Sequence, residues 1–357
     1  VRKKAQEYLD GQTDVNGKSF DIEKDGLKIY TTLNLEMQLA AQKAMRTNLA
    51  KLQKVFDRQI KVKVHKKYPE VYNSELHNSK YYKHLVDLKL SQDSIDYHLA
   101  KIHPVQVFVP GGDTVLQMST QDSIEYYVKL LHTGFMAMQP KSGAILAYEG
   151  GLNYRFLPYD HVQAPRQAAS TFKPFVYATA LDMGADPCYY ISNEREVYEE
   201  HDDWSPGNYN DKYEGYYSMR GALRKSINVA AVRTLLSTGT TNVISKVREM
   251  GISSEIPNDP SIALGSASIS LYEMVQAYAV FANGGFRVEP YFIERIEDPN
   301  GDVLYQHIPK KQERVLQKEV AMMMNDMLQS VVDSGTAVKL RNVYGLKNEL
   351  AGKTGTS

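Results

Sequence analysis

Three short motifs follow one another along this chain, and together they contain the groups that serine-based acyl transfer needs. They are Ser170-Thr171-Phe172-Lys173, Ser226-Ile227-Asn228 and Lys353-Thr354-Gly355-Thr356. A serine hydroxyl is a poor nucleophile until a neighbouring base takes its proton, so Lys173 is a candidate base for Ser170. Each motif alone is common by chance, but the three in this order are a specific signal for a nucleophile, a base, a proton relay and a carboxylate-binding segment.

The first motif is predicted to stand at the start of a helix. Residues three apart on a helix share a face, so Ser170 and Lys173 are expected to touch. Pro174 follows directly, and proline is tolerated in the first helical turn because its N–H would be unpaired there anyway. The apolar run to Leu181 predicts that the helix continues. The alternative is that Ser170 only caps this helix and that Lys173 is an exposed charge.

The second motif lies between two predicted helices, 219–225 and 229–236. If the link between them is extended, Ser226 and Asn228 point to the same side, where they could relay a proton and hold a substrate amide. The alternative is that Asn228 only caps the second helix.

The third motif is predicted to form an edge strand. Gly355 carries no side chain, so a bound peptide could approach the backbone closely. Lys353, Thr354 and Thr356 could then bind a carboxylate through charge-assisted hydrogen bonds. The alternative is an ordinary glycine-containing turn.

Several segments resemble the transpeptidase module of class A, bifunctional penicillin-binding proteins. They are Arg166 to Pro174, Trp204 to Tyr209, Ala279 to Gly285, Gly335 to Ala337 and Gly26 to Leu33. The resemblance covers 134–357 well, 26–50 fairly and 51–120 hardly at all. It implies an α+β, serine penicillin-recognising fold of the β-lactamase and transpeptidase kind. In that fold a central antiparallel sheet is flanked by helices and joined by an all-helical subdomain.

The resemblance also implies a D,D-transpeptidase that cross-links peptidoglycan. Ser170 would attack the D-Ala-D-Ala carbonyl, Lys173 would be the base, and Ser226 would pass a proton to the leaving D-alanine. Donor peptide would be bound by Asn228, Lys353, Thr354, Gly355 and Thr356. The implied partners are donor and acceptor stem peptides, β-lactams that trap the same serine, and other cell-wall synthesis proteins. No cofactor and no metal are expected.

Related activities stay open at this stage. A β-lactamase would need an additional glutamate-held water and usually has Asp where Ile227 stands here. A D,D-carboxypeptidase would use the same residues with water as acceptor, and a β-lactam sensor or inactive cell-wall scaffold would share the fold.

The composition argues against nucleic-acid-binding, disulfide-linked and metal-binding proteins. Lysine and arginine number 42, as do aspartate and glutamate, so a nucleic-acid-binding surface is not expected. Cys188 is the only cysteine, which rules out an internal disulfide, and we expect it to be a buried thiol. The acidic cluster between Glu194 and Asp203 has no metal-ligand spacing and is predicted to be an exposed loop.

The family resemblance and the composition together predict four regions. Residues 1–25 would be an interdomain linker, and 26–53 the strand and helix that begin the transpeptidase module, with an apolar face from Met37 to Leu52. Residues 54–133 would be an accessory insertion, with strands in 104–118 around a Pro110–Asp113 turn. Residues 134–357 would be the transpeptidase domain, incomplete at its C-terminus.

Location and neighbouring segments follow from the same resemblance. No apolar run reaches the length of a membrane span. A membrane anchor and a glycosyltransferase domain are expected upstream, which would place the protein at the extracytoplasmic face of the bacterial cytoplasmic membrane (the periplasm). The chain is also expected to continue past Ser357, because an unpaired motif strand would leave a bare sheet edge.

Two further segments carry specific expectations. The basic stretch 51–84 either contacts anionic glycan, lipid or a partner, or is the solvated face of a helical insertion. Residues 318–333 are predicted to form a helix whose buried row is Met322, Met323, Met327, Leu328 and Val331.

Overall fold

The computed structural model describes residues 1–13, 17–109 and 112–356. The chain divides into two compact units. The first comprises Val1–Asn34, Met136–Tyr148 and the chain from Val162 onward, and the second comprises Leu35–Phe135 and Glu149–His161. This division differs from the four regions expected from the sequence, whose boundaries we keep as a proposal.

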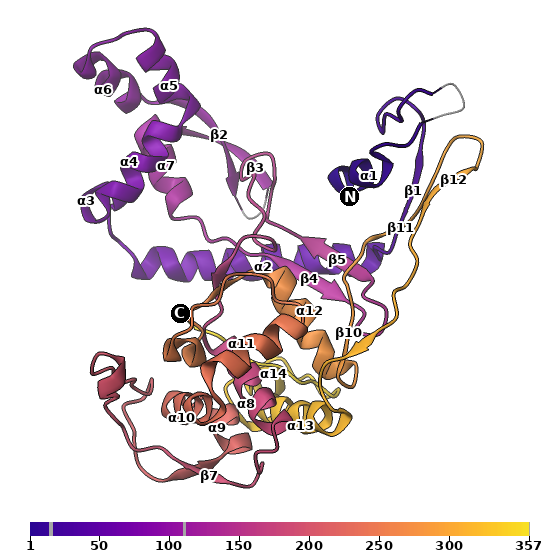
Figure 1. Cartoon of the computed structure of the whole chain (residues 1–357). Coiled ribbons are helices and arrows are strands. Elements are labelled where there is room, and N and C mark those ends of the chain that lie inside the picture. The colour runs from indigo at the N-terminus through magenta and orange to yellow at the C-terminus, as the bar shows by residue number, and fades with distance from the viewer. Residues whose placement is uncertain (14–16, 110–111, 357) are drawn as a thin grey trace. The chain divides into compact units, whose positions relative to one another are not determined.

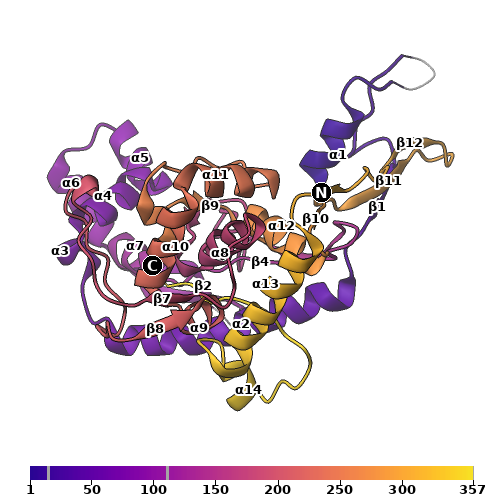
Figure 2. The same cartoon turned by 60° about the horizontal axis from the view of Figure 1, so that its bottom comes forward.

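The first unit is built around helix α8 (Lys173–Asp182), whose residues up to Leu181 are all buried. A helix that is apolar on every side is typical of a protein interior. Helices α9 (Met219–Lys225), α10 (Asn228–Thr238), α11 (Thr240–Glu249) and α13 (Lys318–Ser334) pack against it, as Figure 2 shows. The helix predicted after Ser170 is therefore present and lies at the centre of the core.

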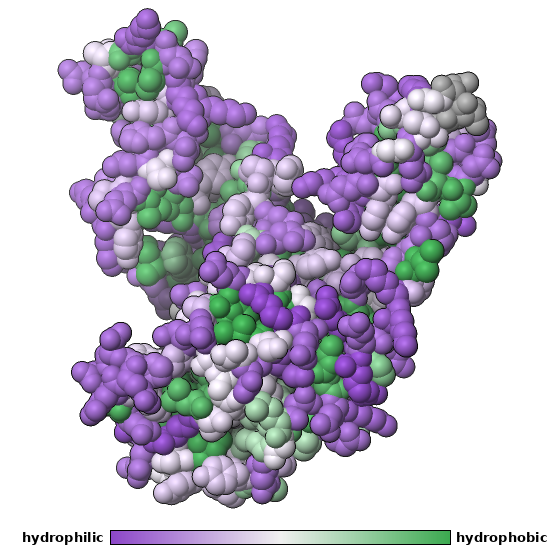
Figure 3. All heavy atoms as spheres, viewed as in Figure 1, coloured by the Kyte–Doolittle hydropathy of each residue, from purple (hydrophilic) through white to green (hydrophobic). Residues whose placement is uncertain are grey.

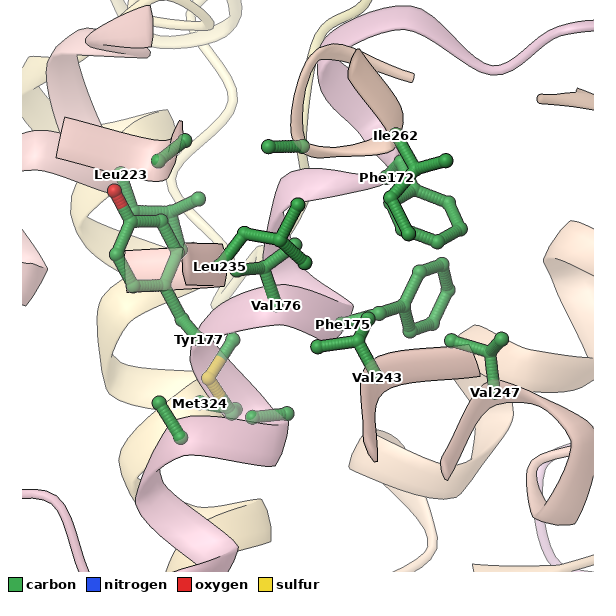
Figure 4. Packing of buried hydrophobic residues seen from close by; sticks show 14 of the residues in the cluster. Phe172, Phe175, Val176, Tyr177, Leu223, Leu235, Val243, Val247, Ile262 and Met324 are labelled. Atoms are coloured by element: carbon green, nitrogen blue, oxygen red, sulfur yellow. The ribbon is translucent and has the colours of Figure 1, made fainter. Parts of the chain in front are cut away.

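Aromatic side chains fill the space beside α8. Phe175 stacks on Phe281 with ring centroids 5.8 Å apart and meets Phe172 edge-on. Phe281 comes from helix α12 (Leu271–Ala282), and Met324 from α13 closes another side of this cluster. In Figure 4, Phe172 and Phe175 lie on one side of Val176, and Met324 lies near Tyr177. Tight packing of this kind holds the first turn of α8 in a fixed position.

The strands of the first unit form small sheets of two or three strands. β1 (Lys28–Thr31) lies beside β11 (Ile293–Glu297), which also pairs with β12 (Val303–Gln306), so that segments far apart in sequence form one antiparallel sheet (Figure 1). β4 (Phe135–Met138) pairs with β5 (Ile145–Glu149). The loop between β4 and β5 is short, whereas β1 reaches β11 from the other end of the sequence.

Three two-stranded pairs lie along the rest of this unit. They are β6 (Arg166–Gln167) with β9 (Ser268–Ile269), β7 (Tyr190–Ser192) with β8 (Tyr216–Ser218), and β10 (Phe286–Arg287) with β13 (Glu313–Arg314). Short helical turns complete it: η1 (Ala169–Thr171), η2 (Glu199–His201), η3 (Pro260–Leu264) and α14 (Lys339–Asn342). The pair β6–β9 stands directly before the predicted nucleophile.

The N-terminal segment holds more structure than its polar composition indicates. Helix α1 (Arg2–Leu9) buries Ala5 and Leu9 in a cluster with Ile293 and Ile296 of β11. Ala5 and Leu9 lie four residues apart and so share one helix face, and Tyr8 adds a stacked contact with Tyr305 of β12, with ring centroids 3.9 Å apart.

The second unit is mostly helical. It contains α2 (Leu35–Gln59), α3 (Val64–Lys67), α4 (Pro69–Asn78), α5 (Lys80–Asp87), α6 (Gln92–Ala100) and α7 (Thr120–Val128), with β2 (His103–Val109) and β3 (Gly112–Met118) as an antiparallel pair. Residues 110–111 of the predicted Pro110–Asp113 turn lie outside the described residues. Every lysine and arginine from Lys51 to Lys83 is exposed, and the face of α3 to α6 seen in Figure 3 is mostly hydrophilic.

Three details of the predicted core are wrong. Met322 of α13 is exposed, because the buried row follows Met324, Met327 and Val331, and a residue two positions from Met324 lies on the opposite side of a helix. On α2 the ends of the expected apolar face, Met37 and Leu52, are exposed. Cys188 is exposed as well, because it lies in the turn after α8 rather than under it.

Among the described residues, no helix combines the length and the apolar character that crossing a membrane requires.

We expect Phe175→Ala to lower the free energy of unfolding by about 3–5 kcal/mol, because it removes a fully buried ring from the α8 core and leaves a cavity. Denaturant unfolding followed by circular dichroism measures the change. Tyr209→Ala, which removes a fully exposed ring, is the matched control and is expected to change the stability by less than about 0.5 kcal/mol. Equal losses in the two variants would contradict a core centred on α8.

Candidate active site

The predicted nucleophile stands on a tightly held turn. Ser170 is the middle residue of η1, and Ala169 before it has φ +48°, a left-handed conformation that residues with a side chain rarely adopt. Two backbone hydrogen bonds fix this turn, from Ala168 N to Ala267 O (3.0 Å) and from Ala169 N to Gly265 O (2.9 Å). A strained conformation of this kind persists only when the surrounding structure enforces it.

Gly265 is what allows the surrounding chain to come so close. It has φ +78°, and a Cβ atom there would overlap the backbone of Ala169. On the other side of the turn, Tyr278 Oη of α12 donates a 2.7 Å hydrogen bond to Thr171 O. The serine is therefore presented by backbone that is anchored from two directions.

Lys173 is the first residue of α8 and is fully buried. Its Nζ donates to Asn228 Oδ1 (2.5 Å), Ser226 O (2.7 Å) and Ser226 Oγ (3.3 Å). All three acceptors are neutral. Burial, and then the positive charge of Lys353, lower the pKa of Lys173 to about 7. The alternative that Lys173 is an exposed charge is therefore wrong, because its side chain is fully buried.

The second motif meets Lys173 in a different geometry from the predicted one. The link is not extended: Ser226 is the left-handed C-cap of α9, with φ +58°. Asn228 is the first residue of α10 and makes no capping bond, so the capping alternative is also wrong. Its side chain is held instead by Gly207 O, which accepts from Asn228 Nδ2 at 2.8 Å. The αL turn is what brings both Ser226 oxygens to the lysine.

The third motif approaches the same hydroxyl from the other side. Lys353 Nζ donates to Ser226 Oγ (3.0 Å) and to Thr354 O (2.7 Å), and burial lowers the pKa of Lys353 to about 8. Thr354 Oγ1 pairs with Thr336 Oγ1 at 2.6 Å. Gly355 passes the nucleophile turn so closely that a Cβ atom would lie 3.0 Å from Thr171 Cγ2.

The predicted edge strand is not present, because residues 351–356 make no ladder with any strand in the described part of the chain. One backbone bond, from Gly352 N to Leu328 O at 3.2 Å, fixes the start of this segment. Thr356 is exposed.

The groups that converge are therefore Lys173, Ser226, Asn228 and Lys353, with Ser170 on the adjacent turn. Ser226 Oγ accepts from two amines of lowered pKa, which makes it a natural proton carrier between them. Within the described residues Ser170 Oγ makes no hydrogen bond, so the expected contact with Lys173 is not formed here. Such contacts often tighten only when substrate is bound.

Sequence reasoning missed the residues that support these groups. Gly265 and Tyr278 hold the nucleophile turn, and Asn208 holds the start of α10 by accepting from Asn228 N (2.9 Å) and Val229 N (3.2 Å). Helix α10 has Ile227 at its N-cap, which cannot cap it. An uncapped helix start is the one signal in the sequence that calls for such a partner. Among the described residues, no three His, Cys, Asp or Glu side chains are grouped so that they could hold a metal ion.

Two known protein families match this chain. Residues 133–357 match the penicillin-binding protein transpeptidase domain, and residues 43–131 match the penicillin-binding protein middle domain. The second match covers most of the stretch expected to be an accessory insertion.

Curated relatives include penicillin-binding protein 2D of Bacillus subtilis, which is 36% identical over 241 residues and aligns with 64% of this chain and 34% of its own length. Penicillin-binding protein 1A of Aquifex aeolicus is 32% identical over 351 residues, covering 94% of this chain and 47% of its own. The chain thus spans half or less of the length of these relatives.

Solved structures agree on the fold. Penicillin-binding protein 1A from Haemophilus influenzae superposes with a TM-score of 0.72 at 22% identity, over 100% of this chain and 62% of that one. The D,D-transpeptidase domain of a peptidoglycan glycosyltransferase from Eggerthella lenta gives 0.54 at 22% identity, over 63% and 66%. With the three motifs, the family match over 133–357 and the shared fold, this chain belongs to the penicillin-binding protein transpeptidase family.

Proposed function

We propose that this chain is a peptidoglycan D,D-transpeptidase that works through an acyl-enzyme on Ser170. The observation that carries the proposal is the buried Lys173 amine, which has neutral hydrogen-bond acceptors, a pKa of about 7 and a position 3.3 Å from Ser226 Oγ. Membership of the penicillin-binding protein family supports stem peptides as the substrate class and β-lactams as covalent inhibitors.

The first half-reaction forms an ester. Neutral Lys173 accepts the hydroxyl proton of Ser170 while Oγ attacks the carbonyl carbon of the penultimate D-alanine. The backbone N–H groups of Ser170 and Thr356 stabilise the oxyanion, each contributing roughly 3–4 kcal/mol. When the C–N bond breaks, Lys173 returns the proton through Ser226 Oγ to the amine of the leaving D-alanine.

The second half-reaction transfers the acyl group. The amine of a second stem peptide attacks the ester carbonyl, its proton passes to Lys173, and Ser170 Oγ leaves and is reprotonated. An amide cross-link forms and the enzyme is restored. Asn228, Lys353, Thr354, Gly355 and Thr356 bind the donor peptide, with Lys353 drawn to its terminal carboxylate.

The wider setting belongs to the same proposal, because the chain spans only part of its relatives. The whole protein would add a glycosyltransferase domain and a membrane anchor, would act at the extracytoplasmic face of the bacterial cytoplasmic membrane (the periplasm), and would work with other cell-wall synthesis proteins. A D,D-carboxypeptidase or a β-lactam sensor would use the same acyl-enzyme. Product analysis with a stem-peptide donor and an added amine acceptor separates them, because only a transpeptidase yields the cross-linked amide.

Ser170→Ala is expected to abolish covalent labelling by benzylpenicillin, because the other hydroxyl on the anchored turn, Thr171 Oγ1, is engaged in a hydrogen bond to Ala168 O. Intact mass spectrometry, with peptide mapping of the adduct, measures the loss. Ser334→Ala, in a helix of the same unit, should label like the unchanged protein and serves as control. A penicillin adduct that forms at normal speed in Ser170→Ala would rule out this nucleophile.

Lys173→Arg is expected to slow acylation by several orders of magnitude, because arginine keeps the positive charge but does not deprotonate in proteins. Stopped-flow labelling with a fluorescent penicillin gives the rate constant. Lys225→Arg makes the same change at an exposed position just before the second motif and is expected to acylate normally. If both variants acylate alike, the base lies elsewhere.

Acylation is expected to rise with pH through a midpoint near 7, because attack requires the neutral form of Lys173. The charge of Lys353 helps to lower that pKa, so Lys353→Gln should move the midpoint to higher pH and also weaken donor binding. A pH–rate profile of penicillin acylation tests both statements. A midpoint that moves to lower pH in Lys353→Gln would contradict the assigned coupling.

A further inference from the structure

Three buried or half-buried asparagines form one hydrogen-bonded chain that ends on Lys173. Asn193 and Asn208 are 1% and 6% exposed. Asn208 Nδ2 donates to Asn193 Oδ1 at 2.7 Å, and Asn208 Oδ1 accepts from the backbone N–H of Asn228, whose own Oδ1 accepts from Lys173 Nζ. The mechanism proposed above uses neither Asn193 nor Asn208.

Asn208 uses its full bonding capacity. Its Oδ1 accepts from Asn228 N and Val229 N, and its Nδ2 donates to Asn193 Oδ1 and to Lys212 O (2.8 Å). A primary amide offers two acceptor sites and two donor hydrogens, so none is left over. A fully hydrogen-bonded buried amide has a single favourable orientation, so the Asn208 side chain is held in one conformation.

The Asn208 side chain caps the N-terminus of α10, which the second motif itself leaves uncapped. Ile227 occupies the N-cap position of α10 and has no oxygen to offer. Asn208 reaches in from the 204–215 loop and pairs with the first two N–H groups of the helix. Removing it would leave those donors buried without a partner, which typically costs about 1–3 kcal/mol per group.

The same loop fixes the orientation of the Asn228 amide. Gly207, the residue before Asn208, accepts from Asn228 Nδ2, so that Oδ1 must face Lys173. Asn193 holds the far end of the loop by donating to Lys212 O (3.1 Å) and Glu214 O (3.3 Å) and by pairing its N–H with Gly215 O (3.0 Å). The loop thus carries two supports of Asn228 at once, one on its backbone and one on its side chain.

We propose that Asn208 is a positioning residue for acylation, which through the α10 cap and Gly207 keeps the Asn228 carbonyl oxygen on the Lys173 amine. The inference deepens the proposed function and rests on it. It assigns the loop before the second motif a part in the chemistry that acts through Asn228.

The proposal predicts the direction of a pH shift. The acceptor Asn228 Oδ1 stabilises the charged form of Lys173, so losing it lowers the lysine pKa further. The titratable group that faces Lys173 in this site is Lys353, which Asn208 does not contact. Asn208→Ala should therefore lower the maximal acylation rate and move the acid midpoint to lower pH, the opposite of the shift expected for Lys353→Gln.

The test is stopped-flow acylation by a fluorescent penicillin across pH, with thermal unfolding measured on the same samples. Asn208→Ala is expected to slow acylation by up to roughly 100-fold, because a displacement of about 1 Å caused by a mutation away from the reacting atoms can cost that much. Asn325→Ala is the matched control, because it removes a half-buried amide that donates to Phe281 O (2.8 Å) outside the site. The control should keep the unchanged rate and midpoint.

Asn193→Ala provides a second variant that leaves the cap itself intact. It should show a smaller loss in the same direction, and it decides the matter if Asn208→Ala does not fold. Rates and midpoints that match the control in every folded variant would overturn the positioning role. Failure of the proposed function is a separate outcome, in which the unchanged protein itself forms no adduct on Ser170.

Discussion

The site depends on burying a lysine amine without giving it a carboxylate. Lys173 is completely enclosed, yet its three hydrogen-bond acceptors are neutral oxygens, and the charge that acts on its pKa, that of Lys353, is also positive. An ammonium group in such surroundings is costly, so the neutral form is favoured near pH 7. A carboxylate partner would instead have stabilised the charged lysine, raised its pKa and left almost no neutral amine at pH 7. The neutral acceptors are thus the feature on which the proposed acyl transfer depends.

The rest of the first unit holds Ser170, Lys173 and Ser226 in fixed positions. Ser226 takes a left-handed conformation so that its backbone and side-chain oxygens both reach the lysine, and Ala169 takes another so that Ser170 projects from its turn. Neither conformation would persist alone. The first is fixed between α9 and α10, and the second by the close approach of Gly265. The densely packed α8 core behind them restricts the movement of both turns.

The sequence predicts what local rules determine. The motif spacing, Pro174 and the apolar run after it are sufficient to place Ser170 ahead of a buried helix, and α9 has the predicted bounds. The predictions that are wrong concern features that depend on contacts between residues distant in sequence. The Ser226 conformation and the missing strand at 351–356 are set by packing and pairing partners, which periodicity does not reveal. The cap from Asn208 crosses 20 residues, and only the uncapped Ile227 hints at it.

The most direct test of this account is the titration of Lys173 itself. Carbon NMR of protein labelled at lysine Cε, with the resonance assigned through its loss in Lys173→Arg, follows the protonation of this one amine in the free enzyme. If Lys173 is the base, its amine should titrate with a midpoint near pH 7, about three units below that of an exposed lysine. A Lys173 amine that stays protonated up to about pH 10 would contradict it, because no neutral base would then be available to Ser170 at physiological pH.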